Sequence, residues 1–424
     1  MIEHILVRNF KSLDEVAIDF VKFNCFVGMN GAGKTTILQA IDFIAQQMRG
    51  DISGWLSVRG WDANDLHCKT RFKSVETLFG DMERVIDLRA AHSATVFIVK
   101  FRLQDGNYLN WGGAFSRKTL RLTRERVWIF EDGESKKHRI CLEVDDQHIK
   151  IGSTIDDPIR FDYEGSVLSQ LKEEILPPEL TELKNYFASL RSLELLSPHL
   201  LRKRSRDTDR DIGSGGERLS GYLNTIKGEE RAKLIVSLKR FYPRLTDYRI
   251  ASKRGGWKSL IAKEDHDGVQ LETEAKHLND GLLRILAILA QESSGKASLV
   301  LLDEIENGIN PEIVEALVDT LVDSKVQIVV TTHSPMVLNY LQSETARKSV
   351  QFVYKTETGH TRVRRFFEIP SIAEKLNYMG PGEAFVDTDL VRLTSEAVLL
   401  DVKMLRDKQK TEARKAAEKV KARA

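Results

Sequence analysis

The chain has 424 residues, 42% of them hydrophobic, which is enough for one large domain or two interleaved domains with a substantial core. The 64 basic residues nearly balance the 62 acidic ones, so overall charge predicts no particular partner and any nucleic-acid surface must be local. No apolar run approaches the roughly 18 residues that span a bilayer, and the N-terminus has no secretory apolar region. We therefore expect a soluble, cytoplasmic protein that makes no membrane contact.

The three cysteines, Cys25, Cys68 and Cys141, are far apart in the sequence and odd in number. They show no metal-ligand spacing, so the sequence indicates neither a zinc site nor a disulfide framework. This usage of cysteine is typical of a reducing compartment.

The first fifty residues predict a series of strands, then a loop, then a helix. Apolar and polar side chains alternate over Ile2–Arg8, and short apolar stretches at Val16–Phe20 and Phe23–Val27 predict two more strands. A glycine-rich turn follows these strands. Residues 34–48 then place their apolar side chains on one face of a helix.

The rest of the chain divides by pattern. Short β-rich runs between residues 95 and 151, separated by turn residues at Gln104–Asn107 and Glu131–Gly133, predict an antiparallel sheet. Residues 167–241 are expected to be mostly helical. Two very apolar strands, SLVLLD and VQIVVTT, are typical of a parallel sheet that is covered on both faces. A helix from about Asp389 leads into a basic tail.

These patterns predict four consecutive segments in the chain. They are an N-terminal lobe with the glycine-rich loop and an antiparallel β subdomain, a mainly helical insertion, a C-terminal lobe, and a basic C-terminal helix or tail, at residues 1–165, 166–277, 278–388 and 389–424. The fold class that follows is α/β, with a mixed central sheet.

The strongest motif is GMNGAGKT, Gly28–Thr35, which lies between a strand and a helix as a phosphate-binding loop requires. Glycines let backbone N–H groups surround the phosphates of ATP, and the helix N-terminus adds its dipole. Lys34 would contact the β- and γ-phosphates, and the Thr35 hydroxyl would bind Mg²⁺. The simpler alternative is a glycine-rich turn that merely starts a helix. The expected nucleotide contacts in this loop are Gly28, Asn30, Gly31, Ala32, Gly33, Lys34, Thr35 and Thr36.

Two strand ends add candidate catalytic groups. The apolar run Ser298–Leu302 leads into Asp303, expected to contact Mg²⁺, and Glu304, expected to orient or deprotonate the attacking water. His333 ends the next apolar strand, where an imidazole can contact the γ-phosphate. The alternatives are two solvated acids and a structural histidine.

A fourth element lies 24 residues before Asp303. Asn279, Asp280 and Gly281 follow Leu278 and precede an amphipathic helix, so they are suited to bind a γ-phosphate presented by a second subunit. The alternative is a plain helix cap by Asn279 or Asp280. A competing glycine-rich stretch, Gly213–Gly221, lies too far from Asp303, and we interpret it as a loop that leads into a helix.

With these elements in order, the chain resembles the soluble ABC-type ATPases of the SMC, RecF and OLD group, and above all the AAA15/AAA21-type ATPases found in prokaryotic defence systems. The opening IEHILVRNFKSLDEVAIDF is similar to that group's first strand and its N-F-[KR]-S turn. HLNDGLLRILAILA resembles its L-S-D-G-T-x-R signature, with Asn279 in place of serine. Asn307–Pro311 resembles its D-loop, and Tyr378–Ala384 its C-terminal ending.

The resemblance implies a dimer in which two heads enclose two ATP molecules with Mg²⁺. Each site would take its phosphate loop, Asp303, Glu304 and His333 from one subunit and its signature from the other. The position of the family's Q-loop glutamine stays open, because Gln104 follows a strand but could equally lie in a hairpin turn. The 269 residues from Lys34 to Asp303 are too many for a transporter head and too few for SMC arms. The chain shows no acidic cluster of the TOPRIM nuclease kind after His333.

The resemblance also suggests a setting and a partner. We expect an ATP-gated homodimer or larger assembly that senses or clamps DNA or RNA and controls a separate nuclease-like effector in antiviral defence. The alternatives are a RecF-like DNA-repair ATPase, a soluble ATPase subunit of a transporter and a small-molecule kinase. The basic stretch Arg202–Arg206 with Arg210, and the tail from Lys403 to Arg423, are candidate nucleic-acid contacts, although both are more often solvated surface.

Overall fold

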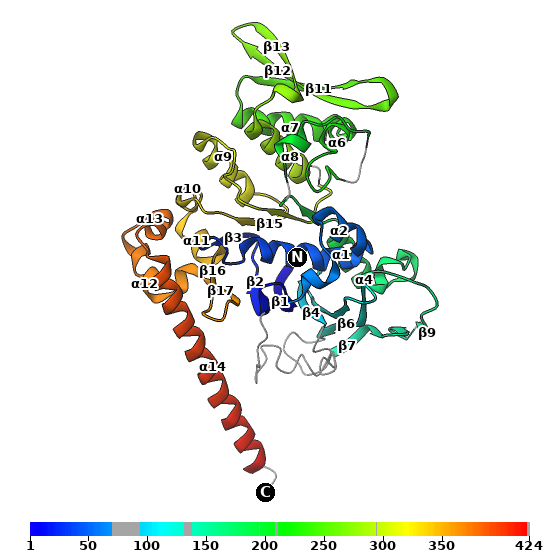
Figure 1. The fold of residues 1–424 in the computed structure, drawn as a ribbon, viewed down its shortest axis with the longest axis vertical. Coiled ribbons are helices and arrows are strands. Elements are labelled where there is room, and N and C mark those ends of the chain that lie inside the picture. The colour runs from blue at the N-terminus through cyan, green and yellow to red at the C-terminus, as the bar shows by residue number, and fades with distance from the viewer. Residues whose placement is uncertain are drawn as a thin grey trace.

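The computed structural model describes residues 1–69, 94–130, 138–153, 155–194, 196–207, 211–293 and 295–421. The described strands form two large sheets, with helix α1 (Lys34–Arg49) packed between them, and a small sheet that projects at one end of the molecule (Figure 1). A long C-terminal helix, α14 (Leu390–Lys421), extends away from the opposite end (Figure 1).

The central sheet carries the strand ends that matter for function. Its order is β10-β14-β15-β3-β16-β17, and every pair is parallel except β16 with β17. The carboxyl ends of its parallel strands therefore meet at one edge, the position where ligands bind in open α/β sheets. The strands are β3 (Phe23–Val27), β10 (Arg191–Ser192), β14 (Leu299–Leu302), β15 (Gln327–Thr331), β16 (Val350–Lys355) and β17 (Thr361–Arg365).

Side chains of the central strands alternate between two hydrophobic cores. In β14, Leu299 and Leu301 pack with α1 and the antiparallel sheet, whereas Val300 and Leu302 pack against helices on the other face. This alternation follows from the two-residue period of a strand. The predicted parallel sheet covered on both faces is confirmed.

The second sheet is antiparallel throughout, in the order β2-β1-β4-β5-β6-β7-β8-β9. The predicted β-rich region from 95 to 151 forms most of it, but the first two strands of the chain also belong to it rather than to the central sheet. The predicted turn at Gln104–Asn107 joins β4 to β5, and the one at Glu131–Gly133 lies outside the described residues. The strands are β1 (Ile2–Phe10), β2 (Leu13–Asp19), β4 (Thr95–Arg102), β5 (Tyr108–Ser116), β6 (Arg121–Phe130), β7 (His138–Asp145), β8 (His148–Ile151) and β9 (Ile155–Pro158).

Helix α1 lies between these two sheets, and most of its side chains are buried. Gly33 precedes it with a φ of 112°, and Gly50 ends it with a φ of 68°. Both glycines adopt the left-handed region that other residues rarely enter. Around α1 lie α2 (Ile52–Arg59), the short 3-10 helix η1 (Ala63–Leu66) and α4 (Pro178–Ala188).

The segment 166–277, predicted to be mainly helical, is helical only in part. Its last third forms an antiparallel sheet in the order β11-β12-β13, and β10 joins the central sheet, so the prediction is wrong for these strands. In β13 no residue is buried, and in β12 the buried residues form one short run followed by charged residues, so neither strand shows the alternating burial pattern of a half-buried strand. The elements are η3 (Val167–Ser169), η4 (Glu173–Ile175), α5 (Pro198–Leu201), α6 (Leu219–Thr225), α7 (Gly228–Phe241), β11 (Leu245–Ser252), η5 (Arg254–Gly256), β12 (Lys258–His266), β13 (Val269–Glu274) and η6 (Ala275–His277).

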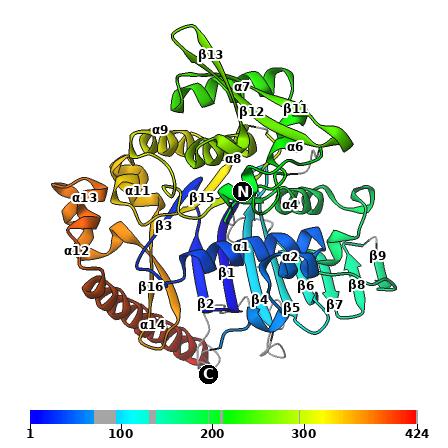
Figure 2. The same cartoon turned by 45° about the horizontal axis from the view of Figure 1, so that its top comes forward.

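The C-terminal half supplies the helices that cover the central sheet on the face away from α1 (Figure 2). Within the described residues, no helix combines the length and hydropathy that crossing a membrane requires. The helices of the C-terminal half before α14 are α8 (Asp280–Ser293), α9 (Pro311–Val322), α10 (Pro335–Asn339), α11 (Ser343–Ser349), η7 (Phe366–Glu368), α12 (Pro370–Ala373), η8 (Lys375–Asn377) and α13 (Pro381–Val386).

Candidate functional site

The loop between β3 and α1 requires glycine at two positions. Gly28 has a φ of 148°, and a Cβ atom there would lie 2.1 Å from the carbonyl oxygen of Val353. A Cβ on Gly33 would lie 2.4 Å from Oγ1 of Thr361. Because β16 and β17 press against the loop from behind, only glycine lets its backbone turn as it does. Ala32 is also held, since Thr361 Oγ1 donates a hydrogen bond to its carbonyl oxygen at 2.8 Å.

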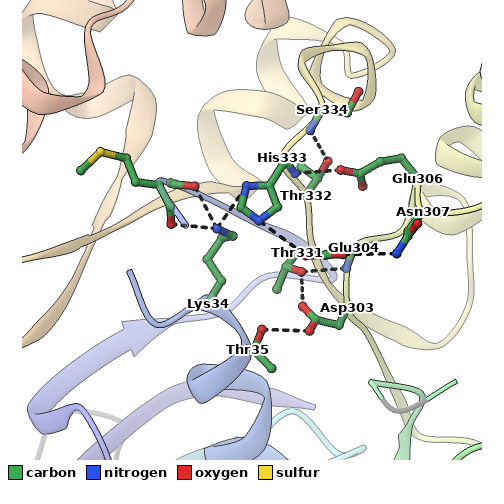
Figure 3. A network of polar contacts seen from close by, with 12 residues as sticks. Lys34, Thr35, Asp303, Glu304, Glu306, Asn307, Thr331, Thr332, His333 and Ser334 are labelled. Atoms are coloured by element: carbon green, nitrogen blue, oxygen red, sulfur yellow. Dashed lines mark hydrogen bonds and ion pairs between the residues drawn. The ribbon is translucent and has the colours of Figure 1, made fainter. Parts of the chain in front are cut away.

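Lys34 is buried beneath this loop (Figure 3). Its ammonium donates hydrogen bonds to the carbonyl oxygens of Gly28 at 2.8 Å and Met29 at 3.1 Å, and lies 3.5 Å from Nδ1 of His333. Burial lowers the pKa of Lys34 to about 8, although Asp303 and the neighbouring glutamates oppose the shift. Lys34 and His333 are 299 positions apart in the sequence, and the structure brings them together at one site, where the motifs had placed both.

Thr35 and Asp303 meet as expected of two groups that bind one cation. The Thr35 hydroxyl donates to Oδ2 of Asp303 at 2.8 Å, and Oδ1 of the same carboxylate accepts from Thr331 (Figure 3). Oxygen ligands of this kind suit Mg²⁺, which is commonly held by one or two protein oxygens plus substrate phosphates. Thr331 was not predicted, although it ends the same apolar strand that leads to His333.

Glu304 lies beside His333 at the mouth of the site. The distance from Oε1 of Glu304 to Nε2 of His333 is 3.7 Å, and the Glu304 side chain is 47% exposed. Its backbone has a φ of 47°, a left-handed conformation that is uncommon outside glycine. The backbone N–H of Glu304 donates to Thr331 Oγ1 at 2.9 Å, and Asn307 Nδ2 donates to its Oε2 at 3.4 Å. Strain of this kind is characteristic of functional sites.

Arg284 connects the signature helix to this strand end. From the second turn of α8, its guanidinium donates to the carbonyl oxygens of Asp303 at 2.6 Å and Glu304 at 2.9 Å. Burial lowers the pKa of Arg284, while Glu306 and the two strand-end acids oppose the shift. Sequence reasoning assigned no role to Arg284, although it matches the arginine of the L-S-D-G-T-x-R pattern.

Glu306 also belongs to the site. Its Oε1 accepts a hydrogen bond from the backbone N–H of His333 at 2.8 Å, which ties the end of β15 to the segment after β14. Sequence reasoning stopped at the Asp-Glu pair and missed this third acid two residues later. This bond restrains the backbone from which the imidazole of His333 projects.

The predicted signature residues do not contact the phosphate loop of their own chain. Asn279 Oδ1 accepts from the backbone N–H of Leu282 at 2.7 Å and so caps α8, and Asp280 forms an ion pair with Arg202. A Cβ on Gly281 would lie 3.0 Å from the carbonyl oxygen of Gly308 in the predicted D-loop. Among the described residues, no hydrogen bond or ion pair joins residues 279–281 to residues 28–36. The capping alternative is therefore present in the structure, and a γ-phosphate role requires a second subunit.

Two further interpretations of the sequence are settled by position. Residues 213–218 form a loop that leads into α6, as expected for the competing glycine-rich stretch. Gln104 lies in the β4–β5 hairpin turn, where its N–H donates to Glu182, so it does not belong to the site. On the side of β14 away from β15 lies β10, and two positions after its end is Glu194, whose pKa burial raises to about 7.

The lowered pKa of Lys34 predicts a pH dependence of ATP binding. Phosphate binds the charged ammonium, so above pH 8 the lysine must take up a proton before it binds. The affinity for ATP is then expected to fall above pH 8, approaching tenfold per pH unit. Calorimetric titration with ATP between pH 7 and 9.5 would measure this pH dependence of the affinity. The Lys34→Arg protein, whose guanidinium stays charged, should lack this slope. Equal slopes in both proteins would contradict the assignment.

The geometry fits a nucleotide with its metal. The loop glycines allow close backbone approach, Lys34 offers one ammonium, and Thr35 and Asp303 bring two oxygens within 2.8 Å of each other. The carboxylate of Glu304 and the imidazole of His333 lie at the open side of the same site. This set of groups can bind a triphosphate and activate water beside it.

Known proteins match short parts of this chain in sequence. An OLD nuclease from Thermus scotoductus is 39% identical over 61 residues, 14% of this chain and 10% of that protein. The DNA replication and repair protein RecF of Bacteroides thetaiotaomicron is 44% identical over 46 residues, 11% of this chain and 12% of that protein. The matched parts thus span only about a tenth of these relatives.

Solved SMC heads align over most of the chain. The SMC head domain from Thermotoga maritima covers 86% of this chain and 98% of its own, with a TM-score of 0.46 and 11% identity. An Smc head derived from Pyrococcus furiosus, bound to the C-terminal domain of ScpA, covers 89% and 99%, with a TM-score of 0.48 and 13% identity.

The profile of one family matches residues 23–339, which is well over half of the chain and includes every predicted site residue up to His333. Together with the OLD and RecF matches, it confirms the predicted resemblance to ABC-type ATPases of the SMC, RecF and OLD group. The chain belongs to the AAA_21 family, described as "AAA domain, putative AbiEii toxin, Type IV TA system".

Proposed function

We propose that this protein binds and hydrolyses ATP as a homodimer that encloses two nucleotides between its subunits. The observation that carries the proposal is the convergence of Lys34, Thr35, Asp303, Glu304 and His333 on one edge of the central sheet (Figure 3). These groups come from helix α1 and from the ends of two parallel strands, β14 and β15, and each has the chemistry that phosphoryl transfer to water needs.

Each residue takes one role in the proposed reaction. Lys34 binds the β- and γ-phosphates, and Thr35 with Asp303 holds Mg²⁺. Bound Mg²⁺ supplies charge neutralisation on the phosphate oxygens. Glu304 orients the attacking water and accepts its proton, and His333 contacts the γ-phosphate. The 3.7 Å between Glu304 and His333 places the two groups on the same side of the site.

The proposed dimer follows from what a single chain leaves open. Asn279, Asp280 and Gly281 lie at the start of α8 beside Gly308, away from the phosphate loop of their own chain. A second copy that presents this surface to the exposed Glu304 would complete the site with a helix N-terminus, which favours bound phosphate. Asn307–Pro311 would then lie at the interface between the copies.

We further propose that this cycle controls a separate, nuclease-like effector in antiviral defence, a setting consistent with the toxin in the family's description. A RecF-like role in DNA repair is the second candidate, supported by the RecF match.

The test is native mass spectrometry of tagged Glu304→Gln protein, purified from its own host with Mg-ATP. A dimer with a stoichiometric second protein supports effector control, and a bare dimer supports the RecF-like candidate. A monomer that ignores ATP contradicts the enclosed-nucleotide site.

A basic and aromatic surface supports contact with nucleic acid. Ser205, in the basic stretch predicted as a candidate, pairs with Lys258 of β12 through backbone hydrogen bonds of 3.2 and 2.8 Å. This pairing brings Arg204 and Arg206 beside Trp257, which is 44% exposed. The guanidinium of Arg206 lies 5.7 Å from the Trp257 ring centre. An exposed ring among cations can stack a base while the cations bind phosphates.

Arg204, Trp257 and the hairpin residues Lys253 and Arg254 line a shallow hollow of about 560 Å³. Glu274 partly balances the charge, since it lies 3.6 Å from both Arg204 and Lys253. The sequence singled out two basic regions. Arg210 of the first lies outside the described residues, as does Arg423 of the second, whose residues up to Lys421 belong to the end of α14. The hollow therefore gives the best-defined candidate surface for single-stranded nucleic acid.

The Trp257→Ala protein is expected to bind a fluorescent single-stranded oligonucleotide about tenfold more weakly than the wild type, because one stacked base contributes about 1–3 kcal/mol. Fluorescence anisotropy over a range of salt concentrations would measure both affinities. Tyr378, 69% exposed on the C-terminal part of the chain, offers a matched control as Tyr378→Ala. Equal affinities of the wild type and the Trp257 variant would remove this surface from the proposal.

A further inference from the structure

Three side chains that can bind a metal ion meet behind the phosphate loop. They are Asp14 near the start of β2, Cys68 just after η1, and His360 in the turn between β16 and β17. Their ligand atoms all lie within 4.8 Å of one another, with Cys68 and His360 buried and Asp14 half-buried. We propose that Asp14, Cys68 and His360 bind one zinc ion.

The segments that carry these residues are fixed by other hydrogen bonds. The backbone N–H of Thr361, next to His360, donates to the carbonyl oxygen of Ser12 at 3.0 Å. The N–H of Cys68 donates to Asn9 Oδ1 at 3.1 Å, and the N–H of Lys11 donates to the carbonyl oxygen of Leu66 at 2.8 Å. The turn at residues 9–12 thus holds all three segments together, so the approach of the ligand atoms follows from the backbone.

The donor set points to zinc. Thiolate, imidazole and carboxylate are the ligands that Zn²⁺ uses, at about 2.3 Å for sulfur and about 2.0–2.2 Å for nitrogen and oxygen. Mg²⁺ and Ca²⁺ prefer oxygen ligands only, so a buried thiol and imidazole disfavour them. Tetrahedral bonds of these lengths place ligand atoms roughly 3.3–3.8 Å apart, so a shift of about 1 Å closes the group around an ion.

His360 also has a polar partner of the kind that metal-binding histidines have. Its Nδ1 lies 2.9 Å from the hydroxyl oxygen of Thr358. Histidines that bind a metal commonly have a hydrogen-bond partner on their second ring nitrogen. With three protein ligands, a water would complete a tetrahedral site.

The location gives the ion a consequence for the nucleotide site. Thr361 follows His360, and its hydroxyl donates to the carbonyl oxygen of Ala32 in the phosphate loop at 2.8 Å and lies 2.8 Å from Ser12 Oγ. A zinc ion that ties His360 to Asp14 and Cys68 would hold this support in place. Removing it is expected to lower the melting temperature and weaken ATP binding, because the loop loses a fixed backing.

The first test is the zinc content of the full-length protein, measured by elemental mass spectrometry after purification without added metal and again after reloading. We expect about one zinc per chain in the wild type and in Cys141→Ser, which changes another buried cysteine. Cys68→Ser and His360→Gln are each expected to bind zinc at least tenfold more weakly. Wild-type protein that takes up no zinc on reloading, or variants that keep it unchanged, would overturn the proposal.

A second measurement starts from the wild-type protein, so its main result does not depend on whether the variants fold. Titration of chelator-treated wild-type protein with Co²⁺ should produce the visible absorption of a tetrahedral ion and a charge-transfer band from a thiolate. Asp14→Asn is the most conservative change. It should lower the affinity for Co²⁺ and reduce the rise in melting temperature that zinc addition causes. Cobalt binding without a thiolate band would show that Cys68 is not a ligand and would refute this site.

Discussion

Glu304→Gln is expected to lower the rate of ATP hydrolysis by roughly 10²–10⁴-fold while the protein still binds ATP. Glutamine keeps the size of the side chain and its hydrogen bond from Asn307, but it cannot accept a proton from water. The phosphate loop, Thr35 and Asp303 are untouched by this change, so nucleotide and metal should bind as before. The blocked reaction should leave the nucleotide-bound dimer as the dominant species.

Phosphate release under saturating Mg-ATP would measure the rate, and size-exclusion chromatography with light scattering would measure the mass. Glu312→Gln supplies the control, because Glu312 is an exposed acid in the first turn of α9, near in sequence but outside the site. Unchanged turnover in Glu304→Gln would remove this carboxylate from the catalytic role. A large loss in both variants would indicate a general effect of charge.

Lys34→Ala is expected to weaken ATP binding by roughly a hundredfold or more, because losing a buried charged partner costs about 2–5 kcal/mol. The ammonium also donates to the carbonyl oxygens of Gly28 and Met29, so these carbonyls lose their donor as well. Titration with a fluorescent ATP analogue would measure the affinity. Lys348→Ala, at a 70% exposed position on α11, is the control. Binding of similar strength to Lys34→Ala and wild type would refute the assignment.

Mixing Lys34→Ala with a second variant can test whether the site is shared between subunits. The second variant, Gly281→Asp, places a negative charge at the predicted signature, against the carbonyl oxygen of Gly308. Each variant alone should be inactive, whereas a mixture should regain part of the wild-type rate, since a mixed dimer holds one intact site. A mixture no more active than its components would argue that each chain uses its own signature or none.

The sequence predicted the local parts of the site well. Gly28–Thr35, Asp303 and His333 follow apolar strands, and the pairing order of β14, β15 and β3 brings those strand ends together. Short motifs that couple a strand to a turn carry their own geometry, which is why their positions can be predicted from sequence alone.

Features that depend on distant pairing could not be predicted. β10 is only two residues long, and its place beside β14 depends on a partner more than a hundred residues away. Strand β13 has no buried residue, so it lacks the buried apolar pattern that marks a strand. The same applies to Asp14, Cys68 and His360, which no spacing rule would group, because only the folded backbone brings them together.

Arg284 has a consequence for communication within the proposed dimer. It anchors the helix that begins with a subunit's signature to the backbone of that subunit's own Asp303 and Glu304. In a shared arrangement, the signature serves the partner's nucleotide while the two acids serve the subunit's own. A shift of α8 on filling one pocket would therefore be transmitted through a single guanidinium to the water-activating carboxylate of the other. The two sites of a symmetric dimer would therefore hydrolyse ATP cooperatively rather than independently.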